Sequence, residues 1–453
     1  INTCGNVLGA LLPGFVLLHW LGIQKGIVAM ATLNICLGLL ILTMRLTRPA
    51  YRRGWRLVLP LVLIGSALVL SRAPVGFQFP SDGERDYFET LYYRDGPSAT
   101  TRVYLDPRSG EKHMSVDGIV IGGTGFAEFK QHLLAHLPKL LLKDTSTELS
   151  VGLGSGILAG ESVRHPGVRE ITSVEIEPSV VEGARYFSKE NHGILDDPRL
   201  INVTDDIGNF LRTTAGTYQV ITADEKTADD YASNGFSYSL DYYALLQDHL
   251  APGGLVAQWV PTTLPPSLYR MILNTFARSF EHVQLWYFLP AHKRGPFNTI
   301  LIGSRHEIHI DYDHISRQFA DHPERFQSLV PYGLTSAEAV IPHFVANEKV
   351  IRPAVATAAV NSLDHPRYEF YYPWDFAADR DGQYIANHDL ITRLKREAFA
   401  DFLTSIDADR QTGLRLRQSI AAEFRYLDAF RQFQTGISLS ELYRIFDDAL
   451  GVA

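Results

Sequence analysis

The chain of 453 residues is long enough for two or three domains, and its 46% hydrophobic and 20% charged residues suit a folded protein with a sizeable core. Its net charge of −8 gives no reason to expect a nucleic acid as a partner. Since the only two cysteines are Cys4 and Cys36, a disulfide framework and a cysteine-rich metal site are excluded.

The first 75 residues contain long apolar runs that set them apart from the rest. Residues 26–44 are long enough to cross a bilayer as a helix, residues 5–23 are of similar length, and residues 57–71 form a shorter run. We therefore expect two or three transmembrane helices within residues 1–75, in contact with membrane lipid. Because the sequence begins at Ile1 inside an apolar run, we also expect it to continue a longer membrane protein.

Short extended segments follow in residues 85–125, separated by the turn dipeptides Asp95-Gly96, Ser109-Gly110 and Asp117-Gly118. Alternation with turns of this kind predicts a small antiparallel β domain. Apolar residues then change to helical spacing in residues 126–142.

Strand and helix patterns alternate from residue 148 onward. Strands are expected near 148–152, 170–176, 200–204, 218–223 and 254–260. Helices are expected near 156–165, 178–190, 206–213, 239–250 and 265–280. This order predicts an α/β domain over residues 126–310, with a mostly parallel, Rossmann-like sheet and helices on both faces.

The α/β domain is expected to end in a β-hairpin and to be followed by helices. Residues 282–289 and 298–305 are two apolar runs separated by a Gly/Pro turn, which favours an antiparallel hairpin at the edge of the sheet. Residues 311–453 are expected to form a mostly helical extension, with amphipathic helices near 388–405 and 412–433. The role of this extension is open between covering the active site and forming a homodimer.

The segment VGLGSG, residues 151–156, precedes VEIEP, residues 174–178, by the length of a helix. A glycine turn lets backbone N–H groups approach a ligand closely, and a carboxylate ending the next strand can bind the two hydroxyls of a ribose. An adenosine-containing cofactor is therefore expected. The spacing of Gly152, Gly154 and Gly156 is tighter than in the dinucleotide motif, which favours a sulfonium nucleoside such as S-adenosylmethionine.

Acidic or polar residues follow four expected strand ends in order: Ser155, Glu175, Asp206 and Asp224. Ligands of open α/β sheets bind at these ends. Each residue alone fits a helix N-cap or a solvated loop equally well, but four strand ends in register favour a site. Glu175 is expected on the ribose hydroxyls and Asp206 on the adenine amino group, and Asp205 is able to exchange roles with Asp206.

Asp224 is the candidate catalytic residue. A carboxylate at this strand end, near the cofactor sulfur, can take a proton from a nucleophile. An amine nucleophile is protonated near neutral pH, so it needs such a carboxylate to orient it and remove the proton. The following Glu225, Asp229 and Asp230 fit either an acceptor-binding cluster or a solvated acidic loop.

Two other kinds of site are not expected. The histidines are scattered and include no HExxH pair, so no metal site is predicted. Ser155 lies in GLGSG, which has a superficial similarity to the hydrolase motif GxSxG. The second glycine precedes this serine directly and no acid–histidine partner is evident, which argues against a hydrolase.

Several of these segments together resemble the spermidine/spermine synthases, and in particular their bacterial membrane-attached relatives. The resemblance covers residues 92–304, and NSLDHPRYEF from Asn361 resembles a further motif of the membrane-attached group. The matching segments are VDGIV (116–120), QHLLAHLP (131–138), VGLGSG, VEIEPSVVEGAR (174–185), LDDPRLINVTDD (195–206), YQVITAD (218–224), FSYSLDYY (236–243) and LAPGGLVAQW (250–259).

This resemblance implies a class I methyltransferase-like sheet behind the small β domain. It also implies transfer of an aminopropyl group from decarboxylated S-adenosylmethionine to an amine or polyamine, by in-line displacement at the carbon next to sulfur. Gln131 and Glu175 would contact the nucleoside together with the glycine turn, Asp206 the adenine, and Asp224 would be the base. Tyr238 is a weaker candidate for contact with the acceptor.

Three positions depart from the family pattern. Ser155 replaces an aspartate that holds the aminopropyl ammonium and would repel the carboxylate of intact S-adenosylmethionine. Thr227 replaces the second aspartate of the acceptor motif, a loss for which Asp229 or Asp230 are candidate replacements, and Thr101 replaces a glutamine. The hypotheses are therefore an aminopropyltransferase, a methyltransferase using intact S-adenosylmethionine, and a nucleoside-binding sensor without turnover.

The arginines and the cofactor indicate on which side of the membrane the large carboxy-terminal part lies. The segment between the second and third apolar runs contains five arginines, Arg45, Arg48, Arg52, Arg53 and Arg56, which favours the cytoplasmic side. If residues 57–71 span the bilayer, the large carboxy-terminal part lies outside, and if they lie in the interface, it stays inside. We expect the second arrangement, in a bacterial-type inner membrane, because the nucleoside substrate is cytosolic.

Overall fold

The computed structural model describes residues 2–12, 18–45, 88–96, 98–224, 234–288, 298–370, 380–405 and 410–435, with isolated positions at 61, 64–65, 68 and 444. The chain divides into two compact units. The first contains residues 1–122 and 177–186, and the second contains residues 123–176 and 187–453.

The first unit contains two helices, α1 (Asn2–Leu12) and α2 (Leu18–Arg45). No helix of the described residues is both long and apolar enough to cross a membrane. The 11 residues of α1 are too few, since they extend about 16 Å against a hydrocarbon core of about 30 Å. The backbone of α2 leaves helical geometry at Gly22, where φ is 72° and ψ is 175°. The transmembrane helices predicted for residues 1–75 are therefore not supported, and most of residues 57–71 lies outside the described residues.

The first unit also contains the predicted small β sheet. Its strands are β1 (Glu89–Asp95), β2 (Thr100–Leu105), β3 (Lys112–Val116) and β4 (Ile119–Gly123), hydrogen-bonded in that order. Asp117 and Gly118 have φ of 51° and 86°, as a two-residue hairpin turn requires, so this predicted turn is confirmed. Helix α6 (Pro178–Ala184) packs on β2, where Gly183 closely approaches Val103 and Met114.

The second unit is built on an eight-stranded mixed sheet in the order β12-β10-β11-β9-β8-β5-β6-β7. The strands are β5 (Thr147–Val151), β6 (Glu170–Glu175), β7 (Leu200–Thr204), β8 (Tyr218–Ala223), β9 (Leu250–Pro261), β10 (His282–Phe288), β11 (Asn298–Ser304) and β12 (Phe344–Asn347). Strands β5 to β9 are parallel, and the remaining pairs are antiparallel. The predicted α/β fold and all five predicted parallel strands are confirmed.

The predicted hairpin forms, but its place in the sheet is different. Strands β10 and β11 pair from His282↔Ser304 to Phe288↔Asn298. We expected this hairpin at the edge, yet β12 pairs with β10 on its outer side and is itself the edge strand. A strand of four residues has too short an alternation to be recognised in the sequence.

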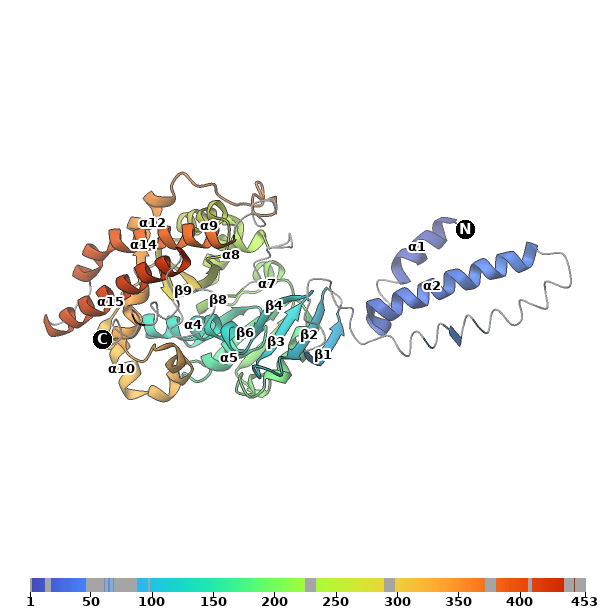
Figure 1. Cartoon of the computed structure of the whole chain (residues 1–453), viewed down its shortest axis with the longest axis horizontal. Coiled ribbons are helices and arrows are strands. Elements are labelled where there is room, and N and C mark those ends of the chain that lie inside the picture. Colours follow the sequence, from blue (N-terminus) through green and yellow to red (C-terminus); the bar gives the residue numbers. More distant parts are fainter. Residues whose placement is uncertain are drawn as a thin grey trace. The chain divides into compact units, whose positions relative to one another are not determined.

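Helices cover both faces of the sheet, and alternate residues of one strand enter different cores. Ile221 belongs to the core under α8 (Leu240–Asp248), α9 (Pro266–Ser279), α12 (Glu348–Val355) and α14 (Arg380–Ser405). Val220 belongs to the core under α4 (Phe126–Leu141), α10 (Tyr312–Asp321), the 3₁₀ segment η5 (Pro323–Tyr332), α11 (Ala337–Val340) and α15 (Arg410–Thr435). In Figure 1, α8 and α9 lie on one side of the sheet and α4 on the other.

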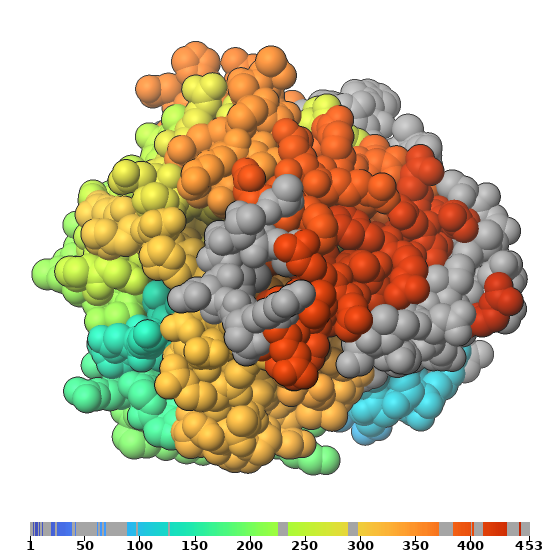
Figure 2. Space-filling view, turned by 90° about the vertical axis from the view of Figure 1, so that its left-hand side faces the viewer, coloured from blue at the N-terminus to red at the C-terminus, as the bar shows by residue number. Residues whose placement is uncertain are grey.

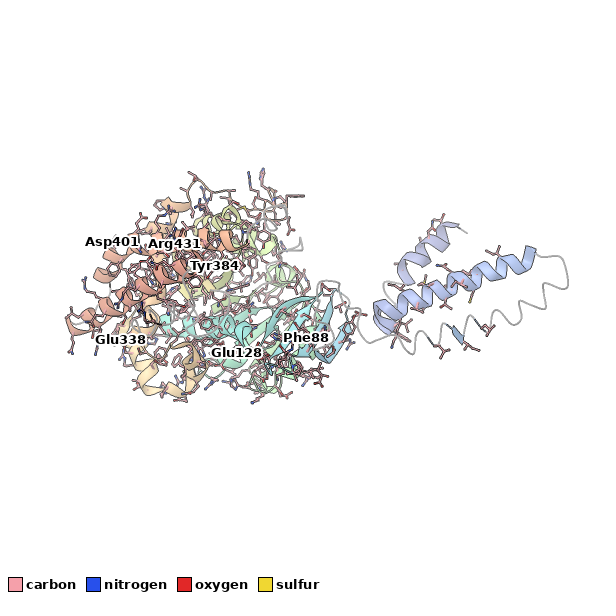
Figure 3. The ribbon with its side chains drawn as sticks, in the orientation of Figure 1. Phe88, Glu128, Glu338, Tyr384, Asp401 and Arg431 are labelled. Atoms are coloured by element: carbon pink, nitrogen blue, oxygen red, sulfur yellow. The ribbon has the colours of Figure 1, made fainter. Side chains whose placement is uncertain are left out.

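The two predicted C-terminal helices, α14 and α15, pack against each other (Figure 2, orange to red). Arg431 of α15 pairs with Asp389 of α14 at 2.6 Å, and Tyr384 meets the Phe430 ring edge-on with centroids 5.7 Å apart. Figure 3 labels Arg431 and Tyr384. Because both helices contribute to the cores named above, residues 380–435 complete the second unit.

Candidate active site

The glycine turn after β5 is folded onto the end of β6. Gly152, Gly154 and Gly156 all have positive φ, of 82°, 55° and 77°, which side chains disfavour. Glu175, the last residue of β6, accepts hydrogen bonds from the backbone N–H groups of Leu153 at 3.0 Å and Gly154 at 3.4 Å. The turn and the predicted ribose carboxylate therefore lie side by side.

A second contact joins the same turn to helix α4. Ser155 is fully buried and its hydroxyl donates to Gln131 Oε1 at 2.9 Å. The Ser155 carbonyl accepts from Asn191 Nδ2 at 3.0 Å. Ser155 thus contributes a neutral hydroxyl to the turn, and the hydrogen of this hydroxyl is already donated to Gln131.

Asp205 and Asp206 directly follow β7, so they lie at the carboxyl ends of the parallel strands, as Glu175 does. The Asp205 backbone N–H donates to the Glu175 carbonyl at 3.2 Å, and its carboxylate accepts from Asn209 Nδ2 at 2.9 Å. Asp206 caps helix α7 (Ile207–Thr213) by accepting from the Asn209 backbone N–H at 3.0 Å. Capping occupies one oxygen of Asp206 and leaves the exposed carboxylate a second one for a ligand.

Asp224 directly follows β8, the strand that pairs with β5 on the side opposite β6. It lies in an ion pair, with Lys130 Nζ of α4 at 2.7 Å from Asp224 Oδ1. The side chains of Lys130 and Asp224 are 14% and 13% exposed. The candidate base is therefore neutralised by a cation of the protein itself.

A buried histidine network fixes α4 against the helix that follows the glycine turn, α5 (Ile157–Ser162). His136 of α4 contacts Glu161 of α5 at 3.0 Å and His165 at 2.9 Å, and His192 contacts Glu161 at 2.8 Å. Burial opposes ionisation of Glu161, but hydrogen bonds from His136 and His192 outweigh it and hold the pKa of its carboxyl well below the usual range. Burial lowers the pKa of the neighbouring His132 to about 4.

The remaining predicted residues either are buried or lie outside the described residues. Thr101 is buried in the first unit, where its hydroxyl lies 2.7 Å from that of Ser179. Tyr238 is buried and stacked on Tyr368, with ring centroids 5.1 Å apart. The predicted acceptor residues Glu225, Asp229 and Asp230, together with Thr227, lie outside the described residues.

Sequence reasoning missed Lys130 and its neighbour Trp259. The Lys130 ammonium lies 4.1 Å from the centre of the Trp259 ring on β9. A signal was present, since Lys130 directly precedes the predicted nucleoside residue Gln131 on one helix. The described residues contain no group of three or more His, Cys, Asp or Glu side chains that could hold a metal ion.

Comparison with known proteins finds similar structures and sequences. A crystal structure of spermidine synthase from Thermotoga maritima is similar over 59% of this chain and 88% of that chain, at 18% identity and a TM-score of 0.48. Polyamine aminopropyltransferase 1 of Streptomyces coelicolor is 30% identical over 270 residues, which cover 56% of this chain and 49% of that protein. Polyamine aminopropyltransferase of Aeropyrum pernix is 34% identical over 161 residues, or 35% of this chain and 51% of that protein.

The chain thus spans about half the length of these two relatives. The model of the spermine/spermidine synthase domain matches residues 127–309, a range that includes the glycine turn, Glu175, Asp206 and Asp224. Residues 127–309 are therefore similar to the spermine/spermidine synthase domain.

Proposed function

We propose that this protein is a spermidine synthase-like transferase that moves an aminopropyl group from decarboxylated S-adenosylmethionine to an amine acceptor. The observation that supports it best is the position of two carboxylates within the matched domain. Glu175 ends β6 and Asp224 follows β8, the two strands on either side of β5 and its glycine turn. Ligands of open α/β sheets bind at this edge.

In this proposal each strand end has one task. The N–H groups of the glycine turn and Glu175 hold the nucleoside, with Asp206 at the adenine. Asp224 orients the acceptor amine and accepts its proton. The amine nitrogen then forms a bond to the carbon next to sulfur, the carbon–sulfur bond breaks, and its electron pair stays on sulfur, which leaves as the neutral thioether methylthioadenosine.

A product assay tests the transfer directly. The full chain is incubated with decarboxylated S-adenosylmethionine and a panel of amines, and products are followed by mass spectrometry. We expect release of methylthioadenosine together with an acceptor heavier by one aminopropyl group. If the nucleoside binds but neither product forms with any amine, the protein is the sensor without turnover and the transferase proposal is wrong.

A methyltransferase is the second candidate, because Ser155 offers a neutral hydroxyl where a carboxylate would exclude intact S-adenosylmethionine. Calorimetry with both sulfonium nucleosides separates the two functions. The aminopropyltransferase proposal requires tighter binding of the decarboxylated form, and tighter binding of intact S-adenosylmethionine would favour the methyltransferase. Replacing Ser155 by aspartate should raise the affinity for the decarboxylated form in either case.

Membrane attachment is part of the proposal and is supported by the apolar runs of residues 1–75. We propose attachment to a bacterial-type inner membrane with the catalytic unit on the cytoplasmic side. The full chain should then sediment with membranes and resist extraction by alkaline carbonate, whereas a peripheral protein would be released. Protease added to sealed, inverted inner-membrane vesicles, whose cytoplasmic face is outside, should then digest the catalytic unit.

A further inference from the structure

Helix α4 places a fixed cation beside the proposed base. Lys130 Nζ lies 2.7 Å from Asp224 Oδ1, and its ammonium lies 4.1 Å from the centre of the Trp259 ring. Trp259 is itself held, because its indole N–H donates to Asn298 Oδ1 at 2.8 Å. Lys130 is thus bound on two sides, by a carboxylate and by the electron-rich face of an aromatic ring.

The pair lies where a ligand can meet both of its members. Asp224 follows the last residue of β8, at the carboxyl edge of the parallel strands. Both side chains keep about one-seventh of their surface exposed, at 14% and 13%. A ligand group entering this edge therefore meets a positive and a negative side chain together.

This charge arrangement distinguishes two classes of amine acceptor. A diamine brings a positive charge at each end, so its ammonium has to share Asp224 with Lys130 and is repelled by it. An acceptor with an amine at one end and a carboxylate at the other can pair its ammonium with Asp224 and its carboxylate with Lys130. One neutral ion pair then becomes two, and no like charges meet.

We infer that Lys130 is a specificity-determining residue, and that the acceptor at this site is an amine that also carries a carboxylate, as an amino acid does. The inference rests on the proposed aminopropyl transfer and names its acceptor class. Lys130 takes no part in the bond changes. It holds the acceptor carboxylate, which leaves Asp224 to take a proton from the acceptor ammonium. The neutral amine nitrogen then forms the bond to carbon while the carbon–sulfur bond breaks and its electron pair stays on sulfur.

Acceptors matched in length test this inference. Putrescine and 4-aminobutyrate have the same number of carbons and differ in one end group, as do cadaverine and 5-aminopentanoate. With the full chain, acceptor binding is measured by calorimetry in the presence of methylthioadenosine, and kcat/KM by its release from decarboxylated S-adenosylmethionine. We expect the wild-type chain to prefer the amino acid in at least one pair, and Lys130→Met to reduce that preference about tenfold.

Two further variants separate charge from folding. Lys130→Gln keeps a polar side chain if the methionine variant does not fold. Lys143→Met removes the same charge from a side chain that is 74% exposed and should keep the wild-type preference. Because the readout is a ratio between two acceptors, a general loss of structure does not change it.

Binding and turnover test the inference and the proposed transfer separately. Tighter binding of the diamines by the wild-type chain, an unchanged ratio in both Lys130 variants, or no binding of any of the four acceptors overturns the inference. A preference for the amino acids that depends on Lys130, without methylthioadenosine release from any acceptor, supports the inference and overturns the proposed transfer.

Discussion

Helix α4 makes two lysine–carboxylate ion pairs with the same sheet. One lies near the amino ends of the parallel strands and the other at their carboxyl ends. Lys139 pairs with Glu148 at the amino start of β5, and Lys130 pairs with Asp224 after β8, both at 2.7 Å. The first pair is 3% and 2% exposed and the second 14% and 13%. With the same chemistry and distance, burial decides the role. The first pair is closed to ligands, whereas the second is partly exposed at the carboxyl ends of the parallel strands, where we propose the active site.

Removing the buried lysine is expected to have the largest effect. Lys139→Met leaves the Glu148 carboxylate buried without its cation and also removes the bond from Lys139 Nζ to Ser162 Oγ, which is 2.9 Å long. We expect the free energy of unfolding to fall by about 3–5 kcal/mol. Urea denaturation followed by circular dichroism measures the change.

A double variant is the control for this prediction. Replacing both members, with Lys139→Met and Glu148→Leu, removes the unpaired charge, so most of the stability should return. A single variant as stable as the wild-type chain would show that Glu148 reaches water, and the contrast between the two pairs would then be wrong.

Between the two lysines on α4, His132 makes stability depend on pH. Burial lowers the pKa of His132 from the ordinary value of 6.5 to about 4. A base whose pKa is lowered by folding stabilises the protein fully above the unfolded pKa, and this contribution is lost as the pH falls from about 6.5 to about 4. The shift corresponds to at most about 3 kcal/mol.

Thermal unfolding between pH 7.5 and pH 4 checks this prediction against a variant. His132→Gln should make the melting temperature less sensitive to pH, because the titrating group is absent. His309→Gln is the matched control, since that side chain is 75% exposed and its removal should leave the pH profile unchanged. Identical profiles for the wild-type and His132→Gln chains would contradict the burial argument.

Strand β6 has a glutamate at each end, Glu170 at its amino end and Glu175 at its carboxyl end, so it allows the same comparison of the two ends of the sheet. Glu175→Gln removes the charge that accepts from the Leu153 N–H at the glycine turn, so methylthioadenosine should bind about tenfold more weakly. Glu170 begins β6 at the opposite edge and is exposed, so Glu170→Gln should not change the affinity. Calorimetry measures both. Equal effects would place the nucleoside away from the turn.

The sequence predicted those features that depend on local pattern. Alternating strands and helices predicted the parallel half of the sheet, and the Asp117-Gly118 dipeptide predicted its hairpin turn. The glycine turn and Glu175 were found together because a motif of fixed spacing joins them. In each case the relevant residues lie within one or two adjacent elements.

Features that depend on distant residues were not predicted. Lys130 and Asp224 are 94 positions apart, and a helical pattern shows which face of α4 is buried but not which charge it meets. Strand β12 joins the sheet 40 residues after β11 and is only four residues long.

The smallest expected effect is the change in stability when Lys130 is replaced. It is the sharpest test of the difference between the Lys139–Glu148 and Lys130–Asp224 ion pairs. Lys130→Met removes the partner of Asp224 and the contact with Trp259, but the Asp224 carboxylate lies at the edge of the sheet and can be hydrated by water. We therefore expect a loss of about 1 kcal/mol, well below that for Lys139→Met, in the same urea experiment. A loss as large as that of the buried pair would make Lys130–Asp224 a structural ion pair. A small loss means that the pair opens at low cost, which is what a ligand that separates its two charges requires.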